Sequence, residues 1–228
     1  GGSIIMAANQ NLTIGTLNTR GGDITLTGTG LNLSGVLNAG VGNVTIKGVS
    51  GGTIGLDGST ASTTASTVST ICNGTSCDMT LVQSELSAIT AGSLTIGDSS
   101  SSDLYIDGAT LSHISGGVTL NSIGPNGSIE FGTADSTLRN ATVNANNNVI
   151  IYGNVTTEGD STFNADFDAD GTGRFSVASG KTLASTGNKN IIIVSSGDIG
   201  IVGNISSGTG ETTISTASGG TIGLGGTA

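Results

Sequence analysis

Three aspartates at alternate positions are the residues best suited to metal chemistry. Asp166, Asp168 and Asp170 lie in the segment DFDADG, which ends at Gly171. Ca²⁺ takes several carboxylate and carbonyl oxygens, and a glycine allows the sharp turn that brings alternate carboxylates to one ion. The match to a helix-loop-helix calcium loop ends there, because Val177 stands at the twelfth position instead of glutamate. The segment predicts a calcium site or, as the alternative, an acidic solvated turn between strands.

The same three aspartates, together with Arg174, are also candidates for a carbohydrate-cleaving site. Pectin-degrading enzymes of the β-helix type place carboxylates and a basic residue along one strand face. Two features argue against catalysis. His113 lies in LSHISGG without a carboxylate or nucleophile in its run, and two Tyr, four Phe and no Trp are few aromatic residues for a sugar cleft. We therefore expect no enzymatic activity and no cofactor other than the calcium considered above.

The two cysteines, Cys72 and Cys77, lie in the segment ICNGTSC within a Ser/Thr-rich stretch. Without a nearby histidine they make a poor metal site. In an exported protein they predict a local disulfide, which would stabilise the fold by roughly 2 kcal/mol because the loop it closes is short. Two reduced thiols are the alternative. Asn73, between them, begins an Asn-x-Thr triplet and is the candidate for glycosylation.

Short β-strands must position these residues. Apolar-polar-apolar runs follow Gly or Asn turns along the chain, and no segment sustains a helical period. Equivalent strands recur about every 20 residues: Ile24 to Val44, Leu31 to Ile54, Ile192 to Thr212 and Ile199 to Ile222. Each interval holds two or three strands and describes one coil of a parallel β-helix. One coil cannot bury its apolar row alone, so the coils must stack.

An internal repeat supports this architecture. The hexapeptide GGTIGL occurs at 51–56 and at 219–224, and the offset of 168 residues continues without a gap over 23–58, with 14 identities in 36 pairs. Apolar residues align with apolar residues under this offset, as Ile24 does with Ile192. Self-similarity of this kind is typical of solenoids.

The pattern divides the chain into three segments. Residues 1–58 are expected to form the end of one long repeat, and residues 59–80 a projecting Ser/Thr-rich loop that carries the cysteines. Residues 81–228 continue the coils and end in a second copy of the repeat end.

Composition excludes several classes of protein. The chain of 228 residues has 40 Gly, one Pro and a net charge of −10, with no cluster of Lys or Arg that could bind a phosphate backbone. Its mean hydropathy of +0.19 and its β-branched strands argue against disorder. No apolar run approaches the ~20 residues of a membrane helix. The start at Gly-Gly-Ser suggests a piece of something longer.

Two long segments carry a resemblance to a known family. TFNADFDADGTGRFSVASGKTL, from Thr162 to Leu183, and GDIGIVGNISSGTGETTISTASGGTIGLGG, from Gly197, resemble the repeat of large bacterial filamentous-haemagglutinin-like exoproteins. The resemblance covers most of 1–58 and 160–228. It implies a right-handed parallel β-helix, export through an outer-membrane transporter, and adhesion or biofilm cohesion at the cell surface. It carries over no catalytic residues.

We therefore expect an all-β, right-handed parallel β-helix that forms a shaft segment of a secreted, cell-surface adhesin. Its expected partners are flanking repeats or further copies joined end to end, together with cell-surface or matrix ligands. The first alternative is a self-polymerising extracellular fibre or sheath subunit. The second is a carbohydrate-active β-helix enzyme.

Overall fold

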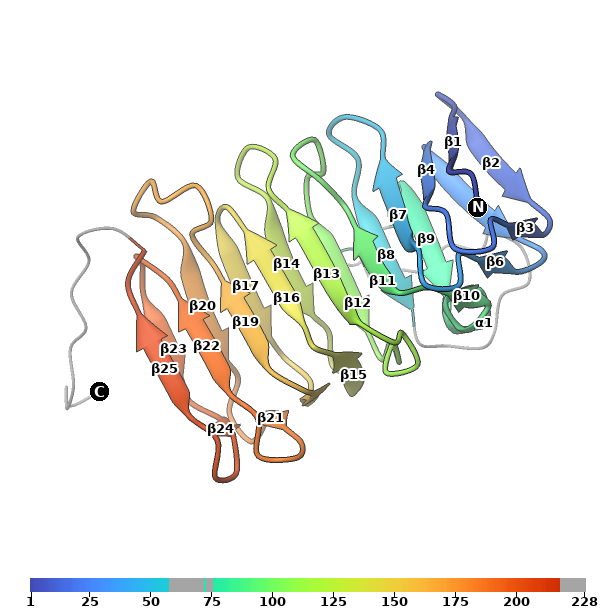
Figure 1. The fold of residues 1–228 in the computed structure, drawn as a ribbon. Coiled ribbons are helices and arrows are strands. Elements are labelled where there is room, and N and C mark those ends of the chain that lie inside the picture. The colour runs from blue at the N-terminus through green and yellow to red at the C-terminus, as the bar shows by residue number, and fades with distance from the viewer. Residues whose placement is uncertain (58–71, 73–75, 218–228) are drawn as a thin grey trace.

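The protein is a parallel β-helix. The computed structural model describes residues 1–57, 72 and 76–217, and in them short strands stack into a solenoid of about 8 turns (Figure 1). Every strand pair of the described residues is parallel. The predicted all-β fold with stacked parallel coils is confirmed.

Each coil contributes strands to three faces. The first face is one continuous nine-stranded sheet that runs the length of the shaft. In stacking order its strands are β1 (Ile4–Ala7), β4 (Ile24–Gly28), β7 (Asn43–Gly48), β11 (Ser93–Ile96), β13 (Gly117–Ser122), β16 (Thr142–Ala145), β19 (Ser161–Asn164), β22 (Ile191–Val194) and β25 (Thr212–Ser215).

The second and third faces are each divided into two sheets. The second face holds β2 (Asn11–Ile14) and β5 (Gly30–Leu33), then β9 (Met79–Val82), β8 (Ile54–Asp57), β12 (Leu104–Asp107), β14 (Ser128–Phe131), β17 (Asn148–Ile151), β20 (Arg174–Val177) and β23 (Ile199–Ile201). The third face holds β3 (Leu17–Asn18), β6 (Leu37–Asn38) and β10 (Ile89–Thr90), then β15 (Ser136–Arg139), β18 (Val155–Glu158), β21 (Thr182–Ser185) and β24 (Asn204–Ser206).

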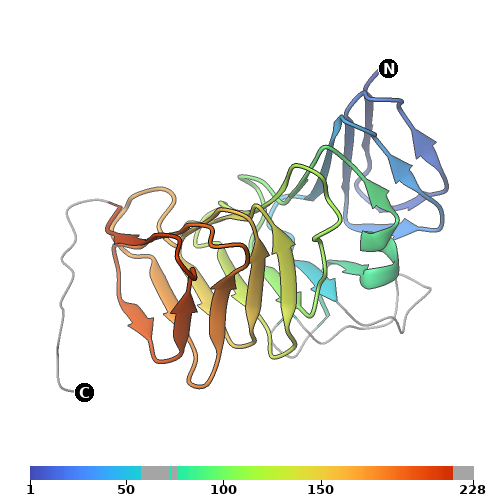
Figure 2. The same cartoon turned by 60° about the horizontal axis from the view of Figure 1, so that its bottom comes forward.

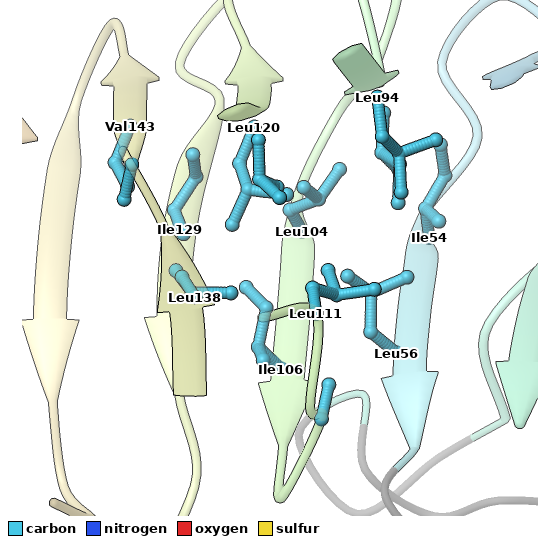
Figure 3. Close-up of a cluster of buried hydrophobic side chains, with 14 of the residues drawn as sticks. Ile54, Leu56, Leu94, Leu104, Ile106, Leu111, Leu120, Ile129, Leu138 and Val143 are labelled. Carbon is cyan, nitrogen blue, oxygen red and sulfur yellow. The ribbon is translucent and has the colours of Figure 1, made fainter. Parts of the chain in front are cut away.

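Alternation along each strand builds one core inside the coils. In the inner coils, inward residues are fully buried, and outward residues are half-buried because their neighbours in the stack cover their sides. In the end strands β1 and β25 the apolar inward residues are only half-buried. Figure 3 shows side chains from the three faces, such as Leu94, Leu104 and Leu138, meeting in the interior. Further along, the rings of Phe131, Phe163 and Phe175 lie 6.2–6.3 Å apart between centroids in tilted and edge-on contacts. The apolar layer that one coil offers becomes a continuous core only through stacking.

Outward positions on the first face form a column of like residues. Thr25, Thr45, Thr95, Thr119, Thr142 and Thr162 follow one another in register on consecutive strands. β-Branched threonine suits an extended backbone on a half-buried surface. This column explains why the sequence alternates so regularly between Ile or Leu and Thr.

The interval between equivalent residues varies because the corners absorb extra residues. It is 20 residues from Ile4 to Ile24 and again from Ile24 to Val44, as predicted. It is 30 residues from Phe163 to Ile193, and the corner between β19 and β20 spans nine residues there, 165–173. The strands stay in register whatever the corner length.

The strand β9 interrupts the regular order of the second face. It pairs with β8 on one side and packs against β5 on the other, so two strands of the same coil lie between β5 and β12. The predicted stacking of Leu31 on Ile54 is therefore wrong: Leu31 pairs with Leu12, and Ile54 pairs with Met79 and Leu104. Residues 79–80, predicted to belong to the projecting loop, are part of β9. Most of that loop lies outside the described residues.

The short helix α1 (Gln83–Ser87) bridges both breaks that the inserted strand causes. On the second face the Glu85 carboxylate accepts hydrogen bonds from the backbone N–H of Leu33 (2.8 Å) and of Val82 (3.0 Å), and so replaces the missing pairing of β5 with β9. On the third face the Gln83 amide donates to the carbonyl of Thr110 (2.9 Å) and accepts from its N–H (2.8 Å). Two side chains thus complete the backbone ladders.

The extra strand bends the shaft. It adds about 4.8 Å to the second face, one strand spacing, and nothing to the first face beside it. Figure 2 shows the first coils inclined to the row that runs from β11 to β25.

The strand β22 is shifted by one residue relative to the sequence repeat. The repeat aligns Ile192 with the buried Ile24, but Ile192 is 39 % exposed, and its neighbours Ile191 and Ile193 point inward. The predicted match of Ile192 to Thr212 is likewise wrong, because Thr212 pairs with Ile191. A strand that is apolar on both faces does not fix its own register. The predicted match of Ile199 to Ile222 lies outside the described residues.

Removal of the Glu85 carboxylate should destabilise the shaft more than removal of an exposed carboxylate. Glu85→Ala leaves two buried N–H groups unpaired, so we expect a loss of about 2–4 kcal/mol in the free energy of unfolding. Urea denaturation followed by circular dichroism measures it. The control is Glu158→Ala, where an exposed contact of 3.9 Å with Arg139 is lost, and about 0.5 kcal/mol or less is expected. Equal losses in the two variants would contradict the bridging role.

Stability should also rise on mild acidification. Burial raises the pKa of the Glu85 carboxyl above its ordinary value of 4.5, although the two N–H donors lower it. Between the unfolded and folded values the folded state binds more protons, so stability falls as the pH rises through that window and increases as the pH falls into it. Urea midpoints at pH 7 and near pH 5 should differ less in Glu85→Gln, which binds no proton. An unchanged pH dependence in that variant would refute the assignment.

Candidate functional site

The three predicted aspartates do come together. Asp166, Asp168 and Asp170 lie in the nine-residue corner between β19 and β20, and one carboxylate oxygen of each lies within 4.8 Å of the others. Asp166 is 1 % exposed, whereas the other two are exposed. Positive φ angles at Ala169 (57°) and Gly171 (94°) let the backbone reverse here. This is the local turn that the glycine in DFDADG predicts.

The buried aspartate organises the corner. One Asp166 oxygen accepts the backbone N–H of Asp170 (3.1 Å), and the other accepts that of Gly171 (3.2 Å). Asp170 in turn accepts the N–H (2.9 Å) and the hydroxyl (2.6 Å) of Thr172. Both Asp166 oxygens therefore accept hydrogen bonds that hold the turn. The carboxylate of Asp168 is exposed to solvent.

Charge is concentrated on the exposed side of this corner. Partial desolvation and the neighbouring charge of Asp170 raise the pKa of the Asp168 carboxyl above its ordinary value. A divalent cation would relieve that repulsion, and carboxylate oxygens at this spacing suit Ca²⁺. Calcium binding stays a prediction.

The predicted carbohydrate-cleaving site combines the three aspartates with Arg174. Arg174 begins β20, and in the part of the chain that the structure describes no ion pair joins it to the three aspartates. His113 is exposed in the turn before β13, which lies two strands away from β19 in the sheet of the first face. The described residues thus bring three carboxylates together and show no ion pair between them and Arg174.

The cysteine pair is bonded. The Cα atoms of Cys72 and Cys77 are 5.3 Å apart and their sulfurs form a disulfide. Asn73, the glycosylation candidate, lies outside the described residues. The disulfide closes a segment just before β9, the strand that enters the second face out of order.

The structure also has a surface recess that the sequence did not predict. A recess of about 130 Å³ opens on the outer side of β17, β20 and β23, and its lining includes Tyr152, Arg174, Ser176 and Gly200. Tyr152, Ser176 and Gly200 follow one another at intervals of 24 positions along the chain, so only the stacking of the coils brings them together. The one signal in the sequence was a basic residue followed two positions later by serine, which is uninformative alone.

Comparison of the chain with protein-family models, with curated proteins and with solved structures gave no match. The fold defines the class: a parallel β-solenoid built from repeated coils. Within the described residues no helix has the length and apolar character of a membrane span, and α1 has five residues.

Calcium should bind at the aspartate corner with a stoichiometry of one ion per chain. Isothermal titration of the metal-free protein with CaCl₂ measures this. The variant Asp168→Asn/Asp170→Asn removes two carboxylates and leaves the structural Asp166, so we expect the heat of binding to be lost. The matched control is Asp160→Asn, which lies in a separate turn where the carboxylate accepts the N–H of Asn190. Indistinguishable titrations of the wild type and the double variant would contradict a site here.

Proposed function

We propose that the chain is a structural shaft segment of a secreted, cell-surface filamentous protein that serves adhesion or matrix cohesion, and that it catalyses no reaction. The observation that carries the proposal is the core. It runs without interruption from the first coil to β22, and the same three-faced cross-section repeats along it. Such a molecule presents length and a repeated surface, which is what a spacer between a cell and its contacts requires.

Two features support an exported location. The Cys72–Cys77 disulfide is typical of proteins that fold in an oxidising compartment. The resemblance of 162–183 and 197–226 to filamentous-haemagglutinin-like repeats points the same way and implies an outer-membrane transporter as partner. Cell-surface or matrix ligands then complete the proposed set of partners.

The edge of the first coil can be covered in the proposed shaft and in its first alternative, a self-polymerising fibre or sheath. Strands β1, β2 and β3 end their sheets, so one side of each has backbone groups free for pairing. Flanking repeats of the same protein would cover this edge in a shaft, and a second copy would cover it in a self-polymerising fibre or sheath. A carbohydrate-active enzyme has weaker support, because among the described residues no ion pair joins Arg174 to the aspartates and His113 lies in the turn before β13.

Negative-stain electron microscopy of the purified chain, with and without a chelator, tests the proposal. Eight steps of the nine-stranded sheet predict unassociated rods with a coil stack about 40 Å long. Native material should have a much greater mass than one chain. Fibres built from separate 228-residue chains would overturn the shaft in favour of the polymer. Glycan cleavage that is lost in Asp168→Ala would overturn both in favour of the enzyme.

A further inference from the structure

The recess on the second face has the features of a ligand site. It lies on the outer side of β17, β20 and β23 in the last described coils, the orange part of the shaft in Figure 1. Apolar groups line it from Ile150, Ala178 and Val202, and polar groups from Tyr152, Arg174 and Ser176. It is separate from the aspartate corner, whose three carboxylates contribute nothing to its lining.

The hollow arises from three residues in register. Ile150 pairs with Ser176, and Ser176 pairs with Gly200, so the outward column loses bulk at each step. Gly200 offers no side chain, and a Cβ built there would lie 3.4 Å from Nη2 of Arg174 and 3.7 Å from Cβ of Ser176. The guanidinium therefore lies over the floor of the recess, above the place that a larger residue would fill.

Two polar side chains of the recess, those of Ser176 and Arg174, have no hydrogen-bond or ion-pair partner among the residues that the structure describes. Ser176 is only 7 % exposed, yet no hydrogen bond to its hydroxyl occurs among the described residues. The same holds for the guanidinium of Arg174, although Asp198 is its neighbour in the stack. A nearly buried hydroxyl and a cation without a counter-ion among the described residues are the groups that an anionic ligand would satisfy.

The walls and the size limit what that ligand can be. Tyr152 is 43 % exposed and Val202 73 % exposed, so an aromatic ring and an aliphatic group stand beside the recess. An enclosed apolar cavity of roughly 150 Å³ holds one benzene molecule, so an open recess of this size takes one six-membered ring. The geometry points to a sugar ring that carries a carboxylate: we propose that this recess binds a uronic acid residue of an acidic glycan.

Each group has a distinct role in this complex. The carboxylate pairs with the Arg174 guanidinium, whose planar donors match two oxygens. A ring hydroxyl bonds to the Ser176 hydroxyl, and the C–H face of the sugar packs on Tyr152 and Val202. The site deepens the proposed shaft function, on which it rests for its biological meaning, by giving one face of the shaft a class of ligand.

The test is a titration of the ¹⁵N-labelled chain with glucuronate, followed by chemical-shift changes of backbone amides. Glucose serves as the neutral analogue, and N-acetylglutamate as a carboxylate without a sugar ring. We expect shifts confined to β17, β20 and β23, a dissociation constant in the millimolar range that is ordinary for one small ligand, and at least tenfold weaker binding of both analogues.

Three variants sharpen the test. Arg174→Gln should weaken glucuronate binding about tenfold, by loss of a charge-assisted pair. Gly200→Val should abolish it by filling the recess and by pushing aside the Arg174 guanidinium, which lies 3.4 Å from a Cβ built at this position. Lys189→Gln, an exposed residue in a turn outside the recess, removes the same charge and should leave the affinity unchanged. The amide spectra of all three variants report whether the fold is intact.

Several outcomes would overturn the assignment. If glucose binds as tightly as glucuronate, the Arg174 cation does not recognise the carboxylate. If N-acetylglutamate binds as tightly as glucuronate, the recess does not recognise the sugar ring. An unchanged affinity in both Arg174→Gln and Gly200→Val moves any binding elsewhere. None of these results bears on the length or assembly of the rods seen by microscopy, so this inference and the proposed shaft function fail separately.

Discussion

The whole molecule depends on parallel backbone pairing between successive coils. In each coil the strands donate and accept along the shaft axis, and the side chains that point inward form the core only because those strands are held in register. The inserted strand β9 would break this pairing on two faces. Glu85 and Gln83 from one five-residue helix supply the missing donors and acceptors, so the stack continues through an irregular coil.

Register also explains where chemistry can arise. Corners tolerate extra residues without disturbing the strands, which lets 165–173 form an acidic turn. Columns of outward residues bring together positions that are distant in the sequence. One is the column of threonines on the first face, and another is the column of Ile150, Ser176 and Gly200 on the second face. The first makes a uniform surface and the second a hollow. A solenoid therefore acquires a site through one small residue in a column.

Much of this structure is predictable from the sequence, and the same physical reasons show which parts of the structure are not. Alternation and Gly or Asn corners located the strands, because each strand must bury one side. The position of β9 was not predictable, since MTLV has the same pattern wherever it stacks. The register of β22 was predicted wrongly because its sequence, IIIV, is apolar on both sides of the strand. The three aspartates could be predicted as a group because they are neighbours in the sequence. The hydrogen bonds by which Asp166 holds the turn, and the recess, depend on contacts that only the folded chain makes.

The seam at Glu85 has a mechanical consequence. Hydrogen bonds between coils lie along the axis of the shaft. Tension applied to its two ends therefore acts on every junction between successive coils, here called a step, in series. Within one step the three faces share the load in parallel. Most steps share it over backbone ladders, but at the seam one face is held by a single carboxylate. The next step is weakened in the same way on the third face, where Gln83 bridges to Thr110, so we expect one of these two steps to yield first under load. The tensile strength of the whole rod is then set by these two joints and is independent of the number of coils.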